Sequence, residues 1–248
     1  MKSVEKLKTY YVGEEAKKYD QIRKSQQAWK KEEEILNDLL KKISKFEGIK
    51  GILDIPVGTG RFLQLYENFA EFVIGIDASN DMLYEARKKS NSLTIETFFY
   101  QGDITNIKVN KKIDIAICIR LLNFFNETLI REVLRELSQV TNNFLIIGIK
   151  TKKNNFNYYF NNTINGVKKI PIFIKKVFEM LLFDHRKFIK KTKGRLKRNF
   201  RSSTHKIFIP KENFLMSCFK DFSFEILEKR LVQSSKKGEN YYLFLLKK

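Results

Sequence analysis

Three short apolar runs, each closed by an aspartate, constrain the fold of this 248-residue chain more than any other feature. The first run, at residues 52–55, contains Asp54, while Asp77 and Asp103 close the second and the third. Buried parallel strands deliver their carboxyl ends to a ligand in this way, because those ends meet at one edge of the sheet. The acids therefore predict a nucleotide-like ligand across the edge of an α/β sheet.

The turn after the first run contains two glycines, Gly58 and Gly60. Glycine lets the backbone approach a ligand closely and adopt positive φ. A dinucleotide-binding turn would need a third glycine where this chain has Leu63, which would crowd the packing of helix on strand. Arg61 suits a ligand carboxylate as well as a pyrophosphate. The turn therefore argues against NAD.

Four segments in order resemble the motifs of class I S-adenosylmethionine-dependent methyltransferases, namely residues 53–60, 73–83, 101–104 and 113–118. The resemblance covers roughly residues 50–150 and implies S-adenosyl-L-methionine as cofactor and S-adenosyl-L-homocysteine as product. The family often has glycine where this chain has Pro56, and a proline is tolerable there because the strand has ended.

The resemblance also implies a role for each acid. Asp54 would orient the turn or accept from the cofactor's amino group, Asp77 would accept both ribose hydroxyls, and Asp103 would accept the adenine amine. The alternative is a simple turn with Asp77 and Asp103 as helix caps. The implied cofactor-binding residues are Asp54, Pro56, Gly58, Thr59, Gly60, Arg61, Asp77, Ala78, Met82, Gly102, Asp103, Ile104, Cys118 and Ile119.

The methyl acceptor is expected beyond the end of the fourth strand, where the chain carries Arg120, Asn123 and Phe124. Arg120 is a candidate clamp for an acceptor carboxylate or phosphate, and Asn123 a candidate for orienting a hydroxyl or amine. Two alternative interpretations are equally open: Arg120 pairs with a core acid, and Asn123 opens a turn. Phe124 is a candidate pocket wall, or core.

A hydroxyl acceptor would benefit from a general base, and His205 stands where the chain returns to the core. A surface or packing role for His205 is the competing interpretation. Tyr19 lies in a segment that resembles the pre-core helix of small-molecule methyltransferases, so it is a candidate substrate contact or a core residue. The catalytic candidates are thus Arg120, Asn123 and His205, and the substrate candidates Tyr19, Arg120, Phe124 and His205.

Alternating apolar strands and helices predict a parallel sheet with helices on both faces. The resemblance implies a Rossmann-like α/β fold, whose seven-stranded, mostly parallel sheet is closed by an antiparallel terminal strand. The Lys/Glu alternation in the helix at 25–45 predicts a solvated face. Four parts are expected: an N-terminal helical cap at 1–48, the S-adenosylmethionine-binding core at 49–150, a basic, aromatic-rich insertion at 151–206, and a helix with a β-hairpin at 207–248.

The net charge of +20 indicates an anionic partner, although coding bias explains much of the lysine content. Residues 165–206 hold fourteen Lys/Arg against two acids, so the charge is clustered. The amphipathic part, 170–201, has three interpretations. It is a lid that contacts an anionic or lipid-linked acceptor and touches the membrane surface, a plain lid, or an RNA contact.

The composition bounds the remaining possibilities. Cys118 and Cys218 lie far apart, no zinc-ligand spacing exists, and no uninterrupted run of 18 apolar residues exists. The sequence predicts a cytoplasmic enzyme without a metal, with a peripheral position at the inner membrane face as the alternative location. It would methylate O or N of a small anionic acceptor such as a sugar-phosphate, glycan or lipid-linked intermediate. An RNA or protein methyltransferase and a non-catalytic binding module are the alternatives.

Overall fold

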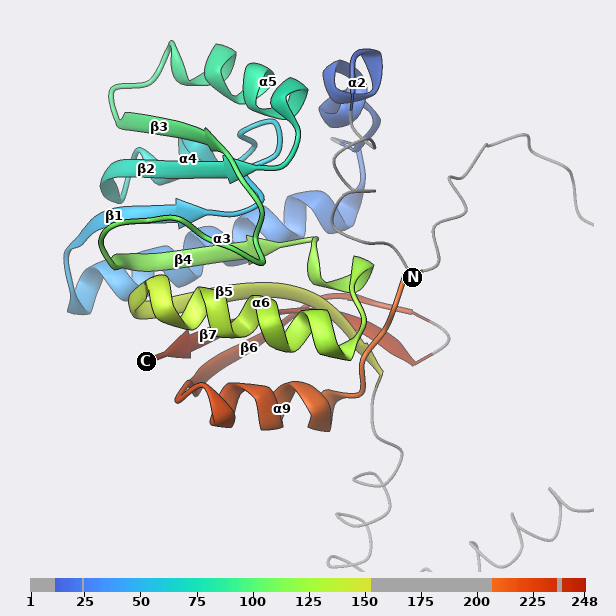
Figure 1. Cartoon of the computed structure of the whole chain (residues 1–248). Helices are drawn as coiled ribbons and strands as arrows, with labels where there is room; N and C mark the ends of the chain where they lie inside the picture. Colours follow the sequence, from blue (N-terminus) through green and yellow to red (C-terminus); the bar gives the residue numbers. More distant parts are fainter. Residues whose placement is uncertain (1–11, 24, 153–206, 236–237) are drawn as a thin grey trace, which may run out of the picture. The chain divides into compact units, whose positions relative to one another are not determined.

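Seven strands form one sheet in the computed structural model, which describes residues 12–23, 25–152, 207–235 and 238–248 (Figure 1). Their order across the sheet is β3-β2-β1-β4-β5-β7-β6. The strands are β1 (Ile49–Asp54), β2 (Ala70–Asp77), β3 (Glu96–Gln101), β4 (Ile113–Ile119), β5 (Thr141–Lys152), β6 (Glu225–Ser234) and β7 (Glu239–Lys247).

The first five strands are parallel, and β7 runs antiparallel to both β5 and β6. This arrangement confirms the predicted fold class. Leu53 of β1 lies opposite Ile74 of β2 and Ala116 of β4, so the ends of these three strands reach the same edge of the sheet. The predicted strand ends therefore come together as the alternation of strands and helices requires.

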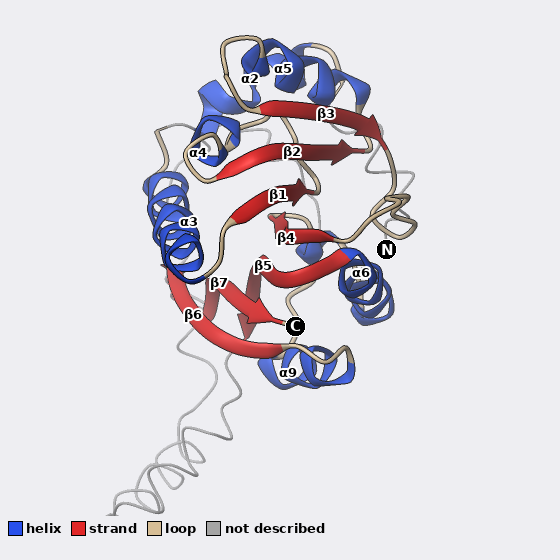
Figure 2. Ribbon diagram, turned by 90° about the vertical axis from the view of Figure 1, so that its left-hand side faces the viewer, coloured by secondary structure: helices blue, strands red, loops and turns tan. Residues whose placement is uncertain are grey.

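The helices form layers on both faces of the sheet, with α3 and α4 on one side and α6 and α9 on the other (Figure 2). Helix α2 lies beside α5 at the β3 edge (Figure 1). The helices are α2 (Glu14–Arg23), α3 (Gln27–Phe46), α4 (Leu63–Tyr66), α5 (Asn80–Ser90), α6 (Glu127–Val140) and α9 (Glu212–Asp221), with a short 3-10 turn, η1 (Leu122–Phe124).

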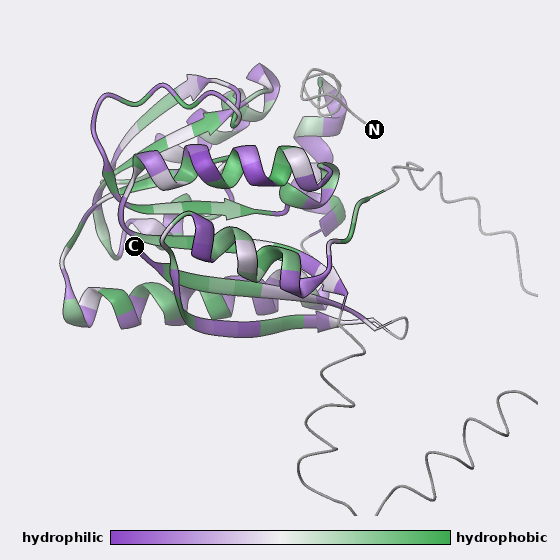
Figure 3. Ribbon diagram, turned by 60° about the horizontal axis from the view of Figure 1, so that its bottom comes forward, coloured by the Kyte–Doolittle hydropathy of each residue, from purple (hydrophilic) through white to green (hydrophobic). Residues whose placement is uncertain are grey.

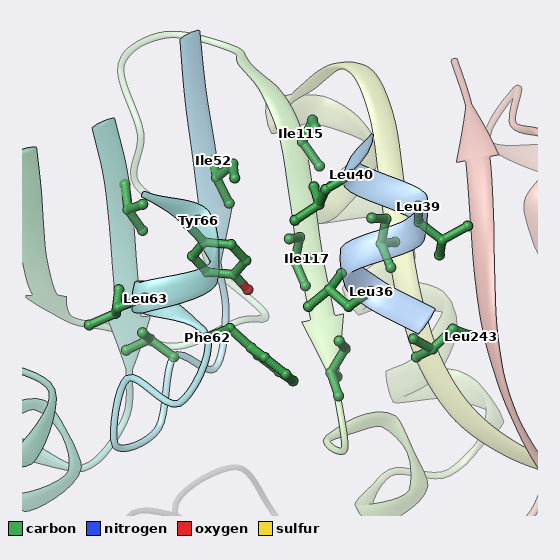
Figure 4. Packing of buried hydrophobic residues seen from close by; sticks show 14 of the residues in the cluster. Leu36, Leu39, Leu40, Ile52, Phe62, Leu63, Tyr66, Ile115, Ile117 and Leu243 are labelled. Atoms are coloured by element: carbon green, nitrogen blue, oxygen red, sulfur yellow. The ribbon is translucent and has the colours of Figure 1, made fainter. Parts of the chain in front are cut away.

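Buried apolar residues fill the space between each helical layer and the sheet. Leu36, Leu39 and Leu40 of α3 pack beside Ile115 and Ile117 of β4 (Figure 4). Each fully buried aliphatic side chain contributes about 1.5–3 kcal/mol relative to an exposed one. The central strands are mostly hydrophobic along their length, while the helices alternate between hydrophobic and hydrophilic residues (Figure 3). A sheet covered on both faces needs that distribution.

Helix α4 has only four residues and begins after the left-handed turn that ends at Gly60 (φ 71°). The predicted insertion at 151–206 lies outside the described residues except for Thr151 and Lys152, which extend β5. The predicted amphipathic part at 170–201 and the clustered basic residues of 165–206 fall within that region. None of the helices in the described part of the chain is long and apolar enough to span a bilayer.

Candidate functional site

The glycine turn after β1 forms one wall of the candidate site. Gly58 and Gly60 both have positive φ, at 57° and 71°. A Cβ on Gly60 would lie 2.5 Å from Leu63 Cδ1 and 3.1 Å from the Ala86 backbone, whereas a Cβ on Gly58 would meet nothing within 4 Å. Gly60 therefore lets the turn pack against α5, and Gly58 keeps its surroundings open. The peptide bond between Ile55 and Pro56 is cis.

Asp77, at the end of β2, ties that strand to the glycine turn. Its Oδ2 accepts a hydrogen bond from Gly58 N and its Oδ1 one from Ser79 N, each at 2.9 Å. The residue is 8% exposed, and burial raises its carboxyl pKa against the lowering effect of these backbone donors. The hydroxyl of Ser79 in turn accepts from Met82 N and caps α5.

Asp54, at the end of β1, is 3% exposed and accepts a hydrogen bond of 3.0 Å from the Tyr66 hydroxyl. Burial raises the pKa of Asp54 to about 8, although the Tyr66 hydrogen bond acts in the opposite direction. Desolvation of a carboxylate disfavours its charged form, so this group takes up a proton more readily than a surface aspartate does.

A cavity of about 130 Å³ opens between these strand ends. Most of the predicted cofactor residues line it, as do three of the predicted substrate residues. From the first group these are Asp54, Pro56, Gly58, Thr59, Arg61, Asp77, Ala78, Met82, Ile104 and Ile119, and from the second Tyr19, Arg120 and Phe124. The chain therefore gathers acids, a glycine turn and apolar side chains around one hollow.

Four predicted cofactor residues lie outside the cavity lining: Gly60, Gly102, Asp103 and Cys118. The Oδ1 of Asp103 accepts from Thr105 N and from Thr105 Oγ1, both at 2.9 Å, which is the geometry of a local turn. Gly102 N donates to Asp77 O at 3.0 Å. Cys118 is fully buried in β4, one residue before Ile119, and its burial raises the thiol pKa.

A second cavity of about 460 Å³ shares Tyr19, Arg120 and Phe124 with the first. Two further cations, Arg23 and Lys150, stand among its lining residues, and no carboxylate does within the described part of the chain. The two cavities therefore meet at the end of β4, and the second one has a basic lining.

Arg120 stands at that junction in the left-handed region, with φ 63°. A non-glycine residue in this conformation costs roughly 1–3 kcal/mol, and such residues are concentrated at functional sites. Its Nε donates to the Glu32 carboxylate at 2.7 Å and 3.0 Å. Its guanidinium carbon lies 5.3 Å from the centre of the Trp29 ring.

Asn123 holds three chain segments together through its side chain. Its Nδ2 donates to Lys150 O at 3.0 Å and Phe208 O at 2.8 Å, and its Oδ1 accepts from Lys150 N at 2.8 Å. The residue is 8% exposed. Its amide is thus engaged with the end of β5 and with the chain that returns from the insertion. The predicted catalytic residue His205 lies outside the described residues.

Helix α2 covers the glycine turn. Asp20 accepts from Thr59 Oγ1 at 2.7 Å and pairs with Lys89, while Gly13 N donates to Asp81 Oδ2 at 2.7 Å. These contacts place Tyr19, which lines both cavities, over the site.

Sequence reasoning missed the buried residues that surround the two arginines: Trp29, Glu32 and Tyr241. The predicted solvated face on α3 is wrong for Glu32, which is 0% exposed and pairs with Arg61 and Arg120. Glu32 lies three residues after Trp29 and three before Ile35, so it occupies the apolar stripe of the helix. That position is the signal that could have identified it.

The chain is similar to known methyltransferases in a family model and in fold. Residues 52–143 match the model of a family described as a methyltransferase domain. A comparison with curated proteins gives no significant match. Solved structures of similar fold include the magnesium protoporphyrin IX methyltransferase of Synechocystis with bound SAH, which is 14% identical with a TM-score of 0.65 and covers 99% of this chain and 100% of its own.

Two further solved structures share the fold. An S-adenosylmethionine-dependent methyltransferase from Clostridium acetobutylicum is 18% identical with a TM-score of 0.61, covering 94% of this chain and 96% of its own. An N-methyltransferase from Bradyrhizobium japonicum is 10% identical with a TM-score of 0.54, covering 87% and 95%. At these identities the likeness shows a common fold.

Proposed function

We propose that the protein is a class I, S-adenosylmethionine-dependent methyltransferase and that it transfers a methyl group from this cofactor to a small anionic acceptor. The match of residues 52–143 to a methyltransferase-domain model supports the proposal. The cofactor would occupy the first cavity and the acceptor the second. The methyl group would pass between them at Tyr19, Arg120 and Phe124, the residues that both cavities share.

The residues of the first cavity fit the cofactor. Gly58 leaves open space where a side chain would otherwise stand, and Asp77 presents a carboxylate to ribose hydroxyls beside it. Ala78, Met82 and Ile104 supply apolar cover for an adenine ring. Asp54 stands where it would face the cofactor's ammonium group, whose positive charge would favour the ionised carboxylate.

The basic lining of the second cavity is the single observation that carries the choice of acceptor. Arg23, Arg120 and Lys150 surround a space whose described lining contains no carboxylate. Guanidinium and ammonium groups around a partly enclosed space attract a carboxylate or phosphate, and they repel a cation. The acceptor is therefore proposed to carry such a group beside the oxygen or nitrogen that is methylated.

When bound, the cofactor supplies a methyl group already activated by a sulfonium leaving group. The chain's own residues then chiefly align the acceptor and exclude water. Phe124 and Tyr19 line the junction, and Trp29 of α3 lines the first cavity, with its ring centre 5.9 Å from that of Tyr19. Asn123 holds the end of β5 in place through its three backbone contacts, so we assign it a supporting role at this wall.

The test is an assay of S-adenosylhomocysteine formation with two pools of small molecules, one anionic and one neutral or cationic, matched in size. The proposal expects turnover with the anionic pool only. Turnover confined to the neutral pool, or to added RNA or protein, would reject the proposed acceptor class while leaving methyl transfer itself intact.

Peripheral membrane contact through 170–201 and an RNA or protein substrate fall on residues outside those described, and they stay predictions. Steep salt dependence of RNA binding, lost when the basic residues of 190–201 are neutralised, would support the RNA alternative. Liposome co-sedimentation that depends on Phe173 and Leu181 would support membrane contact.

A further inference from the structure

A buried carboxylate on α3, Glu32, connects the walls of the two cavities. It is completely buried, whereas its neighbours Glu33 and Glu34 are exposed. Burying a carboxylate is costly unless it is paired and hydrogen-bonded. The groups that pair with Glu32 come from elements far away in the sequence, so its role extends beyond the helix that carries it.

Three groups share the Glu32 carboxylate. Its Oε2 lies 2.5 Å from Arg61 Nη1 and 2.7 Å from Arg120 Nε. Its Oε1 lies 3.0 Å from Arg120 Nε and accepts the hydrogen bond of the Tyr241 hydroxyl. Glu32 thus joins the turn after β1, the end of β4 and strand β7.

Trp29, one helical turn before Glu32, gives both cations an aromatic face. The guanidinium carbon of Arg61 lies 3.7 Å from the centre of the Trp29 ring, and that of Arg120 lies 5.3 Å from it. The backbone carbonyl of Trp29 also accepts from Arg61 Nη2. The helix therefore fixes the planes of two guanidinium groups through two residues spaced three apart.

The cluster of Glu32, Arg61, Arg120 and Tyr241 has more hydrogen-bond donors and more positive charge than its one carboxylate can pair. Two arginines face one buried carboxylate, since Glu33 reaches Arg61 only at 3.7 Å and is exposed. Among the described residues, Arg61 Nε and Arg120 Nη2 are buried nitrogen atoms without a hydrogen-bond partner. Arg61 lines the first cavity and Arg120 lines both, so the two cations that share Glu32 stand at the walls where anionic ligands would bind.

We propose that Glu32 is a positioning residue, which holds Arg61 for the carboxylate of the cofactor and Arg120 for the anionic group of the acceptor. The inference rests on the proposed function, because it needs a ligand in each cavity. A core that required only filling would be at least as stable with apolar residues in place of a buried ion cluster. The cluster at the junction of two cavities therefore indicates a role in ligand binding.

The test compares two ligands that differ at the cofactor's amino-acid end. S-adenosylhomocysteine carries a carboxylate, and 5′-methylthioadenosine has the same adenosine without it. Glu32→Gln is expected to weaken binding of the first about tenfold, because Arg61 loses its anchor, and to change binding of the second less than about twofold. Glu34→Gln, an exposed position on the same helix whose ion pair is with Lys31, is the control, and calorimetry measures the affinity of each protein for both ligands.

Glu32→Asp separates position from charge, because it keeps the buried negative charge and shortens the side chain by one methylene. It is expected to show the same selective loss for S-adenosylhomocysteine, at about threefold, with the fold retained. Equal weakening of both ligands, or an unchanged ratio in both variants, would overturn the proposal. Binding of both compounds by the unmodified protein tests the proposed function separately, since it does not depend on Glu32.

Discussion

The Asp77 carboxylate accepts the backbone N–H of Gly58 at 2.9 Å, which joins the end of β2 to the turn after β1. The same carboxylate accepts from Ser79 N, so one buried acid organises two neighbouring loops at the sheet edge. A ribose placed beside this acid would meet a group whose position is already set. Pre-set partners lower the entropy that a ligand loses on binding.

Replacement of Asp77 by alanine should therefore weaken the binding of S-adenosylhomocysteine by about 3 kcal/mol, since hydrogen bonds to a buried charged group are lost. Calorimetric titration measures this change. Asp38→Ala, which removes an exposed acid from α3, is the control and should leave affinity unchanged. Equal affinity of the Asp77 variant and the unmodified protein would contradict the role given to this residue.

The protonation of Asp54 predicts a dependence of stability on pH. Burial raises its folded-state pKa to about 8, above the ordinary value of 3.8, so between these values the folded state holds a proton that the unfolded state has released. The free energy of unfolding should then fall as pH rises through this window, by up to about 1.4 kcal/mol per pH unit from this group.

Asp54→Asn should remove that contribution. Urea unfolding at pH 5 and pH 8 measures it: relative to the unmodified protein, the variant should gain stability as the pH rises. The Tyr66 hydroxyl can still donate to the asparagine oxygen, so the comparison isolates the titrating group. A difference between the two proteins that does not change with pH would show that Asp54 is ionised throughout.

Helix α2 should behave as a cover held by polar contacts, because Ala16 is its only buried residue within 14–23. Asp20→Ala removes the contacts to Thr59 and Lys89, which are partly exposed and together worth about 1 kcal/mol. Dissociation of S-adenosylhomocysteine should become about fivefold faster, and amide exchange in α2 should increase.

Stopped-flow release and hydrogen exchange measure these two effects. Glu15→Ala, at an exposed position of the same helix, should change neither. Faster exchange without faster release would mean that α2 opens without controlling the cofactor.

Lys150 provides a test of the basic second cavity. Lys150→Gln should raise the KM of an anionic acceptor about fivefold, through loss of a nearby charge, while the affinity for S-adenosylhomocysteine stays within about twofold. Steady-state kinetics and calorimetry give the two values. Lys152→Gln, two residues further along β5 and exposed, is the control. Equal effects of the two substitutions would place the acceptor elsewhere.

Local patterns predicted the sheet and most of the cofactor wall. The apolar run at 52–55 overlaps β1, and the motif segments that begin at residues 73 and 113 begin within β2 and β4. Gly58 and Asp77, which the motifs single out, line one cavity. Such features depend on residues near one another in the chain, where spacing determines geometry.

The rest of the site depends on contacts between distant residues. Glu32 meets Arg120, 88 residues away, and Tyr241, 209 residues away. Asn123 was a catalytic candidate because of its position after β4, yet its partners Lys150 and Phe208 lie 27 and 85 residues further along. Spacing along one sequence does not encode such pairs, so only the position of Glu32 on an apolar stripe pointed to its burial.

The most direct measurement of the central claim is a crystal structure of the protein with S-adenosylhomocysteine. The account predicts the adenosine in the first cavity, with its ribose hydroxyls on the Asp77 carboxylate, its adenine against Met82 and Ile104, and its sulfur turned toward the junction at Arg120. A cavity that stays empty at saturating ligand, or a ligand bound away from the ends of β1 and β2, would contradict it.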